Sequence, residues 1–463
     1  MSKQTSVRYK LAAEAAESGK SKLSRQSPRA GLLALVRACR GLGLPAATDE
    51  HLPGPYPLLE YQILAQASGA DSMLDREILA RDPCLNAGLE YPAPSDAELK
   101  EFLSDLGQGD PANTGFSNLL AATVGNATTV WTRKGNPFAS SRPYKGTLDV
   151  VKMSAAGGGA PAVWAKPDGE FPCRVACLWR EADLVLAGGR CASHQDVIEL
   201  IQRAQAALPA RTFCSLLHAD PVCDDPAILS WLQAQQTKIT ARPKAHRYNV
   251  PRADSVELRY LVAVKLDPVT VRTLDDVAQG WTDCPDVAAG SLQWLDLPFE
   301  MLPPPVRELG DAQIVRRRAT TPSGGQSYLY AAFRAKTGGE KHNVARRFTQ
   351  GEEQMRRAAE DIALLAADPE GKHDDPTAEG RFLVALLAYN ACSMLRHVWP
   401  ASGLGPWLSR FRATLLCASG HISKHENQRQ LTIYDAFLHK RFLNINAAFP
   451  VDEAATVPRK TKA

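Results

Sequence analysis

Membrane-spanning runs, cysteine frameworks and strong net charge are all missing from this 463-residue sequence. No run approaches the roughly 18 apolar residues of a membrane helix, so we expect no contact with a membrane. The ten cysteines show no regular spacing and follow no signal-peptide pattern, which favours free thiols in a reducing cytoplasm. A net charge of only +4 is compatible with a polyanionic partner but does not require one.

Two classes of catalytic site also lack their motifs. Nucleophilic catalysis by Ser or Cys would need a partner motif such as Gly-x-Ser-x-Gly, and the sequence has none. Cys173 and Cys177 lie four residues apart, but no second paired motif follows at zinc spacing. Buried free thiols are therefore a better interpretation of the cysteines than a zinc site.

What is present indicates a globular protein of two or three domains, with 44% hydrophobic and 22% charged residues. Residues 1–28 are rich in Ser, Lys, Arg and Gln and predict a basic disordered tail. Residues 29–125 have a helical period and predict a helical N-terminal domain for DNA binding or dimerisation. Ser95 and Glu98 have the spacing of a capping box there. Residues 107–145, rich in Gly, Asn, Ser, Thr and Pro, predict a loop-rich connection.

The period changes in residues 126–244, where short apolar runs are joined by turns. The predicted order is several strands, a helix capped by Ser193, another strand, a helix from Pro226 and a last strand. This order is the layout of a ribonuclease-H-like α/β domain. The predicted strands are Gly146–Met153, Ala162–Lys166, Cys173–Trp179, Ala182–Ala187, Thr212–Leu217 and Lys238–Arg242.

In that layout the first strand lies beside the end of the strand that follows the first helix. Asp149, inside the first strand, would then meet Asp220, which directly follows the later strand. Two carboxylates in one cleft hold Mg²⁺ well, because the ion prefers oxygen ligands. An acid at a strand end is also common as a plain helix cap, and this stretch alone leaves both interpretations open.

Residues 245–335 are rich in predicted strands again. We interpret them as an inserted β module rather than a continuation of the sheet. Arg316, Arg317 and Arg318 follow one another in one of these strands and could meet a phosphate backbone. Because neighbours in a strand point to opposite faces, at least one of them could instead be paired within the protein.

Residues 336–400 return to a helical period and complete the predicted catalytic domain. A helix from Asn343 carries Glu352 next to the apolar stripe of that helix, where it could reach both aspartates as a third metal ligand. An ion-paired surface helix is the alternative. An apolar helix from Phe382 follows, and residues 401–463 predict C-terminal helices, at Phe411–Cys417 and Tyr434–Leu443, and a tail.

Motifs in this order resemble those of bacterial DDE transposases, in the insertion-sequence 4 superfamily and most like its 1380 group. The resemblance covers nearly the whole chain. Its motifs are Gly69-Ala-Asp-Ser-Met-Leu-Asp, Leu79-Ala-Arg-Asp-Pro, Thr147-Leu-Asp149-Val, Gly189-Arg-Cys-Ala-Ser-His, His218-Ala-Asp220, and Ala385-Leu-Leu-Ala-Tyr-Asn-Ala-Cys-Ser-Met-Leu-Arg.

The resemblance implies an insertion-sequence transposase that cuts transposon ends and joins them to target DNA by two-metal phosphoryl transfer with Mg²⁺ or Mn²⁺. Asp149, Asp220 and Glu352 would be its catalytic acids and metal ligands. It also implies a bacterial cytoplasmic protein, associated with the nucleoid, whose partners are double-stranded DNA and a second copy of the chain. The expected DNA contacts come from Arg316, Arg317, Arg318, Arg346, Arg347 and Arg356.

The chain departs from the family pattern at several positions. The second acid is followed by Pro-Val-Cys rather than Ser-Gly-Phe, and the expected Tyr, Arg and Lys around the third acid are missing. Glu353 is therefore an alternative third acid, although Met355 and Arg356 favour Glu352. A degenerate relative that only binds DNA, and a Mg²⁺-dependent nuclease without strand transfer, are the alternative functions.

Overall fold

The computed structural model describes residues 26–434, except for 53, 71–72, 90, 109–113, 133–143, 154–170, 210–211, 239–254, 286, 289, 321–325, 338, 368–375, 399–407 and 426–427. The chain forms two compact units, one of residues 1–140 and 361–463 and one of residues 141–360. Of the basic tail predicted at residues 1–28, residues 1–25 lie outside the described residues, whereas residues 26–27 form a strand. The predicted strand at Ala162–Lys166 and the predicted helix at Tyr434–Leu443 also lie outside the described residues, apart from Tyr434.

The first unit is mainly helical, as predicted for residues 29–125. The capping box at Ser95 is confirmed: the Ser95 amide donates to Glu98 Oε2 at 2.8 Å and the Glu98 amide donates to Ser95 Oγ at 3.3 Å. The helices are α3 (Leu32–Gly41), α4 (Leu44–His51), α5 (Tyr56–Ser68), α6 (Met73–Ala80), α7 (Pro83–Leu89), α8 (Asp96–Gln108), α9 (Thr114–Thr132), α15 (Pro376–Val398), α16 (Leu408–Phe411) and η4 (Arg412–Leu416).

Helix α15 belongs to this first unit, whereas we predicted that residues 336–400 complete the catalytic domain. The helix is buried on all sides over most of its length and packs against α3, α5, α8 and α9. A helix that is apolar all round needs neighbours all round. Gly107 and Gly380 allow the backbones of α8 and α15 to approach closely, since a Cβ at either would lie within 2.0 Å of a carbonyl oxygen of the other helix.

Two further predictions for this unit are wrong. Helix α9 forms within the stretch predicted as a loop, because Phe116, Leu119, Leu120 and Val124 bury a stripe that outweighs the poor helix propensity of its Gly, Asn and Thr residues. The C-terminal region is not only helical. Strands β13 (Gly420–His425) and β14 (Gln428–Ile433) form a hairpin that pairs with β1 (Gln26–Ser27).

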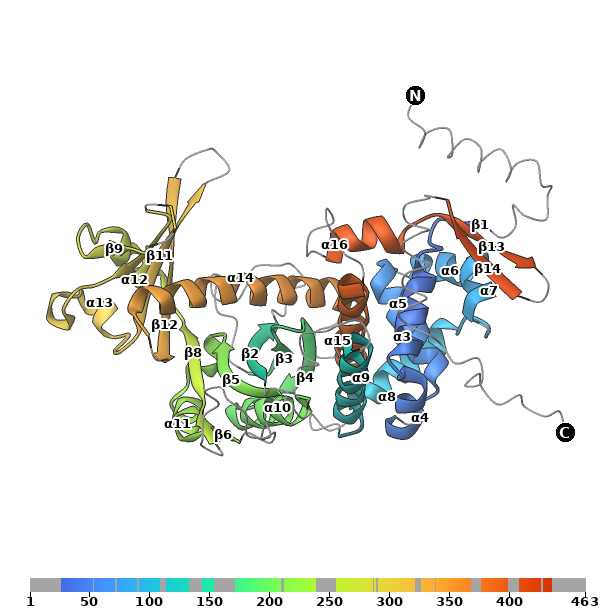
Figure 1. Ribbon diagram of the computed structural model, residues 1–463, viewed down its shortest axis with the longest axis horizontal. Coiled ribbons are helices and arrows are strands. Elements are labelled where there is room, and N and C mark those ends of the chain that lie inside the picture. The colour runs from blue at the N-terminus through green and yellow to red at the C-terminus, as the bar shows by residue number, and fades with distance from the viewer. Residues whose placement is uncertain are drawn as a thin grey trace, which may run out of the picture. The chain divides into compact units, whose positions relative to one another are not determined.

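The second unit is built on a nine-stranded mixed sheet, in the order β4-β3-β2-β5-β8-β12-β11-β10-β9 (Figure 1). Strands β5 and β8 run parallel to β2, and every other neighbouring pair is antiparallel. The strands are β2 (Tyr144–Met153), β3 (Cys173–Trp179), β4 (Leu184–Cys191), β5 (Thr212–Ala219), β8 (Arg259–Val264), β9 (Trp281–Asp283), β10 (Leu292–Leu295), β11 (Gln313–Thr320) and β12 (Gln326–Lys336).

Helices cover both faces of this sheet: in Figure 1, α10 (His194–Ala207) lies below β2–β5, α11 (Pro226–Ala234) lies at the lower end of β8, and α14 (Lys341–Ala366) lies above β2–β5. Ser193 caps α10 through a capping box with Asp196, which confirms the predicted helix start. Asp225 caps α11 by accepting from the Ala227 and Ile228 amides. The remaining elements are β6 (Gln236–Lys238), β7 (Ser255–Glu257), η2 (Pro221–Cys223), α12 (Pro268–Asp275), η3 (Phe299–Met301) and α13 (Pro304–Arg307).

The strands of residues 245–335 continue the main sheet, so the prediction of a β module that does not continue it is wrong. Strand β8 pairs in parallel with β5 on one edge and antiparallel with β12 on the other. Strands β11, β10 and β9 then extend the same ladder. Leu261, Val262 and Ala263 are fully buried, which makes β8 a central strand that needs partners on both edges.

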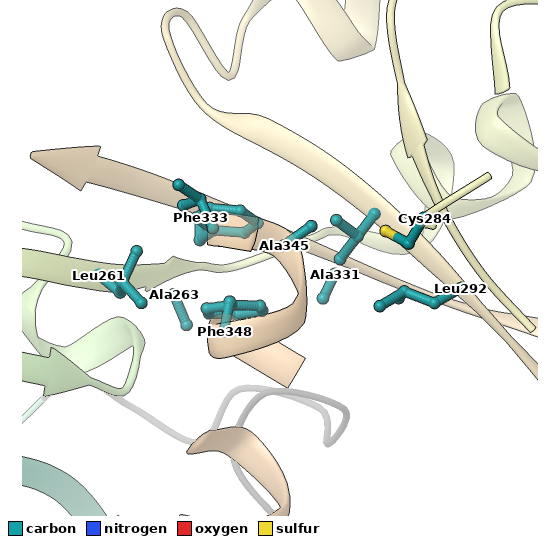
Figure 2. Close-up of a cluster of buried hydrophobic side chains, with 10 residues drawn as sticks. Leu261, Ala263, Cys284, Leu292, Ala331, Phe333, Ala345 and Phe348 are labelled. Atoms are coloured by element: carbon teal, nitrogen blue, oxygen red, sulfur yellow. The ribbon is translucent and has the colours of Figure 1, made fainter. Parts of the chain in front are cut away.

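Helix α14 is anchored to this extension by an apolar cluster (Figure 2). The Phe348 ring stacks on the Phe333 ring with 4.2 Å between centroids. Burial of these side chains fixes the rotation of α14 about its axis, so the next helical turn faces β2 and β5. The cluster comprises Leu261, Ala263, Cys284, Leu292, Val315, Ala331, Phe333, Val344, Ala345 and Phe348.

Within the described part of the chain, no helix is both long and apolar enough to cross a membrane. All ten cysteines are free, and only Cys417 is exposed, which agrees with the interpretation as buried free thiols.

Candidate active site

Asp149 and Asp220 lie on neighbouring parallel strands. An extra residue in β5, at Ser215, shifts the register so that Asp149 stands opposite His218. Residues two apart in a strand share a face, so Asp220, two residues after His218, lies on the same side of the sheet as Asp149. The strand register therefore brings these two acids close together, as we predicted.

Asp220 is held in place by the backbone of β2. Its amide donates to the Val150 carbonyl at 3.0 Å, and its Oδ2 accepts from the Lys152 amide at 2.8 Å. The helix cap at this strand end is Asp225 instead. The side chain of Asp220 therefore bonds to β2 and does not act as a plain helix cap, which was the alternative interpretation.

Helix α14 brings Glu352 to the same place. The Phe348 ring lies 5.1 Å from the His218 ring, and a Cβ added at Gly351 would lie 2.0 Å from His218 Nδ1. The helix therefore touches the face of β5 that carries the acids, and only glycine fits at position 351. Farther along the helix, Arg357 donates to Asp183 at 2.9 Å and ties α14 to the turn after β3.

All three acids are almost completely buried: Asp149 and Asp220 are each 3% exposed, and Glu352 is 8% exposed. Glu352 Oε1 is buried and has no hydrogen-bond partner among the described residues. An ionised carboxylate without partners in such a place is costly. The cluster therefore has acceptor capacity that the described protein groups leave unused.

Burial raises the pKa of each of the three acids. It raises the pKa of Asp149 to about 6, against the opposing effect of the nearby Arg180 guanidinium. It raises the pKa of Asp220 to about 7, with a further contribution from the Asp149 charge. It raises the pKa of Glu352 to about 8, with a further contribution from Asp220. Asp149 thus lies close enough to Asp220, and Asp220 close enough to Glu352, to oppose ionisation of the neighbouring carboxyl group.

Arg180 is a cation in direct contact with this cluster, and it was not predicted from the sequence. Its Nε donates to Asp149 Oδ2 at 2.9 Å, and its Nη2 donates to Asp149 Oδ1. Nη2 also lies 2.7 Å from His218 Nδ1, which must then accept. Burial and the Arg180 charge lower the pKa of His218 well below its usual value, so the ring is neutral with its proton on Nε2.

Glu353, the alternative third acid, points elsewhere. Its side chain is 46% exposed and pairs with Arg356 and, at 3.8 Å, with Arg317. The structure thus places Glu352, and not Glu353, beside the aspartates. As they stand, the described residues contain no group of three or more His, Cys, Asp or Glu side chains arranged to hold a metal ion.

The predicted DNA-contacting arginines fall into two groups. Four are engaged within the protein: Arg316 lies over the rings of Trp281 and Tyr328, Arg317 pairs with Glu353, Arg346 bonds Asn343, and Arg356 pairs with Glu353 and Glu360. Arg318 and Arg347 are exposed. The predicted alternation of the three consecutive arginines between faces is confirmed, because Arg317 points toward α14 while Arg316 points to the opposite face.

No model of a known protein family matches this chain, and no curated protein matches it.

Proposed function

We propose that the chain is a DDE-type transposase of an insertion sequence, which cuts transposon ends and joins them to target DNA. The observation that carries the proposal is the convergence of Asp149, Asp220 and Glu352. They come from β2, from the end of β5 and from α14. All three carboxyl groups are buried, Asp149 raises the pKa of Asp220, and Asp220 raises the pKa of Glu352. Clusters of like charge with strongly shifted pKa values are typical of functional sites.

The arrangement of strands supports a ribonuclease-H-like catalytic domain. In the order β4-β3-β2-β5-β8, each neighbouring pair among the strands β4, β3 and β2 is antiparallel, and β5 and β8 then run parallel to β2. Helix α10 lies between β4 and β5 in sequence, and α11 follows β5. This is the order that the resemblance to DDE transposases implies, and it places the first two acids on adjacent strands.

The three acids offer ligands that suit a divalent cation such as Mg²⁺ or Mn²⁺, although in the described structure they are not arranged to hold one together. Asp149, Asp220 and Glu352 would hold it, because all three offer the oxygen ligands that these ions prefer. Glu352 Oε1, for which the described residues offer no hydrogen-bond partner, supports this assignment. When bound, such ions activate the attacking hydroxyl and stabilise the leaving oxygen of a phosphodiester.

The chain's own groups would prepare the site for this chemistry. The Lys152 amide orients the Asp220 carboxylate, and Phe348 and Arg357 fix α14 so that Glu352 faces inward. Exposed Arg318 and Arg347 are the strongest candidates for contact with the DNA backbone. Such contacts position DNA without reading its sequence. The protein would act as a homodimer on paired ends, in the bacterial cytoplasm.

The test is a plasmid that carries the DNA flanking the gene on both sides, incubated with the protein, a target plasmid and Mg²⁺ or Mn²⁺. Nicking at the element's ends followed by joining to the target supports a transposase. Nicking without joining supports the Mg²⁺-dependent nuclease. Binding of the flanking DNA without nicking by either metal overturns the proposal of a cutting enzyme.

A DNA-binding relative without catalytic activity is the second candidate. It is favoured by the Arg180 guanidinium, which occupies both oxygens of Asp149. A carboxylate paired in this way serves stability, as in many structural ion pairs. The same plasmid assay separates this candidate from the first.

A further inference from the structure

Arg180 and Asp149 form a two-pronged ion pair inside the acid cluster. The two side chains are 15% and 5% exposed. Both Asp149 oxygens accept from the guanidinium, one from Nε at 2.9 Å and the other from Nη2. This fork-to-fork geometry is the strongest arrangement of arginine with a carboxylate.

The backbone around Arg180 fixes its position relative to β2. The Arg180 amide donates to the Thr147 carbonyl at 3.0 Å, and the neighbouring Glu181 carboxylate accepts from the Thr147 amide at 2.9 Å. Thr147 lies two residues before Asp149 on the same strand. The turn after β3 is thus locked to β2 where its arginine reaches the acid.

The far end of the guanidinium is enclosed by β5 and α14. Nη2 lies 2.7 Å from Nδ1 of His218, a residue with no exposed surface. A Cβ at Gly351 would lie 2.5 Å from the same Nη2, so the helix backbone closes directly over it. The guanidinium therefore occupies space among the elements that carry all three acids.

A divalent cation and this guanidinium compete for the same oxygens. Mg²⁺ binds carboxylate oxygens at about 2.1 Å in a strict octahedral geometry. A guanidinium bonded to both oxygens of the ligand would lie only a few ångströms from the ion, where their charges repel strongly in a buried site. Metal binding at Asp149 is therefore disfavoured as long as Arg180 stays on both of its oxygens.

We infer that Arg180 is an internal counter-ion that keeps the acid cluster free of metal until the phosphate backbone of DNA draws its guanidinium away from Asp149. A phosphate group is an anionic, two-pronged acceptor of the kind that arginine binds best. Loading of the metal is thereby coupled to binding of DNA. This inference rests on the proposed function, because it assumes that the three acids bind a divalent cation.

The test measures Mn²⁺ affinity by electron paramagnetic resonance, in the full-length wild type and in Arg180→Met, with and without a DNA duplex from the flanking region. We expect Arg180→Met to bind Mn²⁺ about tenfold more tightly than the wild type without DNA, since one repelling charge is gone. DNA should tighten Mn²⁺ binding by the wild type and have little effect on the variant. Arg180→Gln, which keeps a donor for Asp149 without the charge, should fall between the two.

Asp149→Asn, alone and combined with Arg180→Met, identifies the site that is measured. Equal Mn²⁺ affinity of wild type and both Arg180 variants, lost with Asp149→Asn, would overturn the counter-ion role and leave the proposed metal site standing. Mn²⁺ binding that is unaffected by Asp149→Asn in every background would overturn the metal site and the counter-ion role together. Circular dichroism establishes that each variant is folded before it is compared.

Discussion

Glu60 and Glu352 are both buried glutamates, one in each compact unit, and their surroundings are opposite. The Glu60 carboxylate accepts hydrogen bonds from Arg40 Nε at 3.2 Å, Tyr56 Oη at 2.7 Å and Tyr91 Oη at 2.9 Å. Glu352 has neighbouring acids and an oxygen without a hydrogen-bond partner in the described part of the chain. The hydrogen bonds of the first acid lie within the fold, whereas the second is the one that we propose binds a metal ion.

The largest effect expected from this comparison is on DNA cleavage. Asp220→Asn removes a proposed metal ligand but keeps the shape of the side chain, so we expect metal-dependent nicking to fall by about a thousandfold or more. Asp225→Asn is the matched control: it lies five positions on in the sequence and caps α11, and Asn caps a helix as well as Asp does. Nicking by Asp220→Asn at the wild-type rate would remove this acid from the site.

Next in size is the effect of neutralising the acid that serves stability. Glu60→Gln leaves Arg40 and two tyrosine hydroxyls facing an amide, so we expect the free energy of unfolding to fall by about 2 kcal/mol. Urea unfolding followed by circular dichroism measures it. An unchanged midpoint would show that the hydrogen bonds of Glu60 are not what this buried acid contributes.

Substitution of the other buried glutamate, Glu352, by Gln should have the opposite effect on the free energy of unfolding. At pH 8 without metal, Glu352→Gln removes a charge that burial and Asp220 disfavour, so we expect the free energy of unfolding to rise by about 1 kcal/mol. Glu353→Gln, one residue along α14 and exposed, should change it by less than about 0.5 kcal/mol. If Glu352→Gln destabilises the protein as much as Glu60→Gln does, the two buried acids do not differ in their effect on stability, and the comparison is wrong.

The smallest effect is a pH dependence of stability. The folded-state pKa values of about 6, 7 and 8 for Asp149, Asp220 and Glu352 lie above those of the unfolded chain. The folded protein therefore holds more protons between pH about 4 and about 8, and these groups make its unfolding free energy fall as pH rises across that range. Glu352→Gln should reduce this slope in metal-free thermal unfolding, and Glu353→Gln should not. A slope that Glu352→Gln leaves intact would show that Glu352 has an ordinary pKa.

Local sequence signals predicted the elements that carry the acids and the helical first unit, but not the pairings between segments that are distant in the sequence. The apolar runs of β2 and β5 and the Ser193 cap are local patterns, and the expected strand order then paired Asp149 with Asp220. The pairing of β8 with β5 depends on contacts between distant segments, so the extension of the sheet was missed. The polar hairpin β13–β14 carries too little apolar alternation to be recognised.

The position of Arg180 in the site could not be predicted from the sequence. It lies just after β3, outside any motif, and its contact with Asp149 follows from the antiparallel register that places Leu178 opposite Asp149. A charged residue at the end of a strand that flanks an acid-bearing strand is the one signal that could have drawn attention to it. Gly351 is similar, because only the packing of α14 on His218 makes its lack of a side chain necessary.

The most direct test of the metal site is the anomalous X-ray scattering of Mn²⁺ in crystals of the protein bound to flanking DNA. We predict a peak whose nearest protein atoms are carboxylate oxygens of Asp149, Asp220 and Glu352, at about 2–2.5 Å, with Arg180 turned away from Asp149. A peak elsewhere, or a Mn²⁺-free acid cluster with Arg180 still on Asp149 in the DNA complex, would contradict the assignment of these three acids as a catalytic metal site.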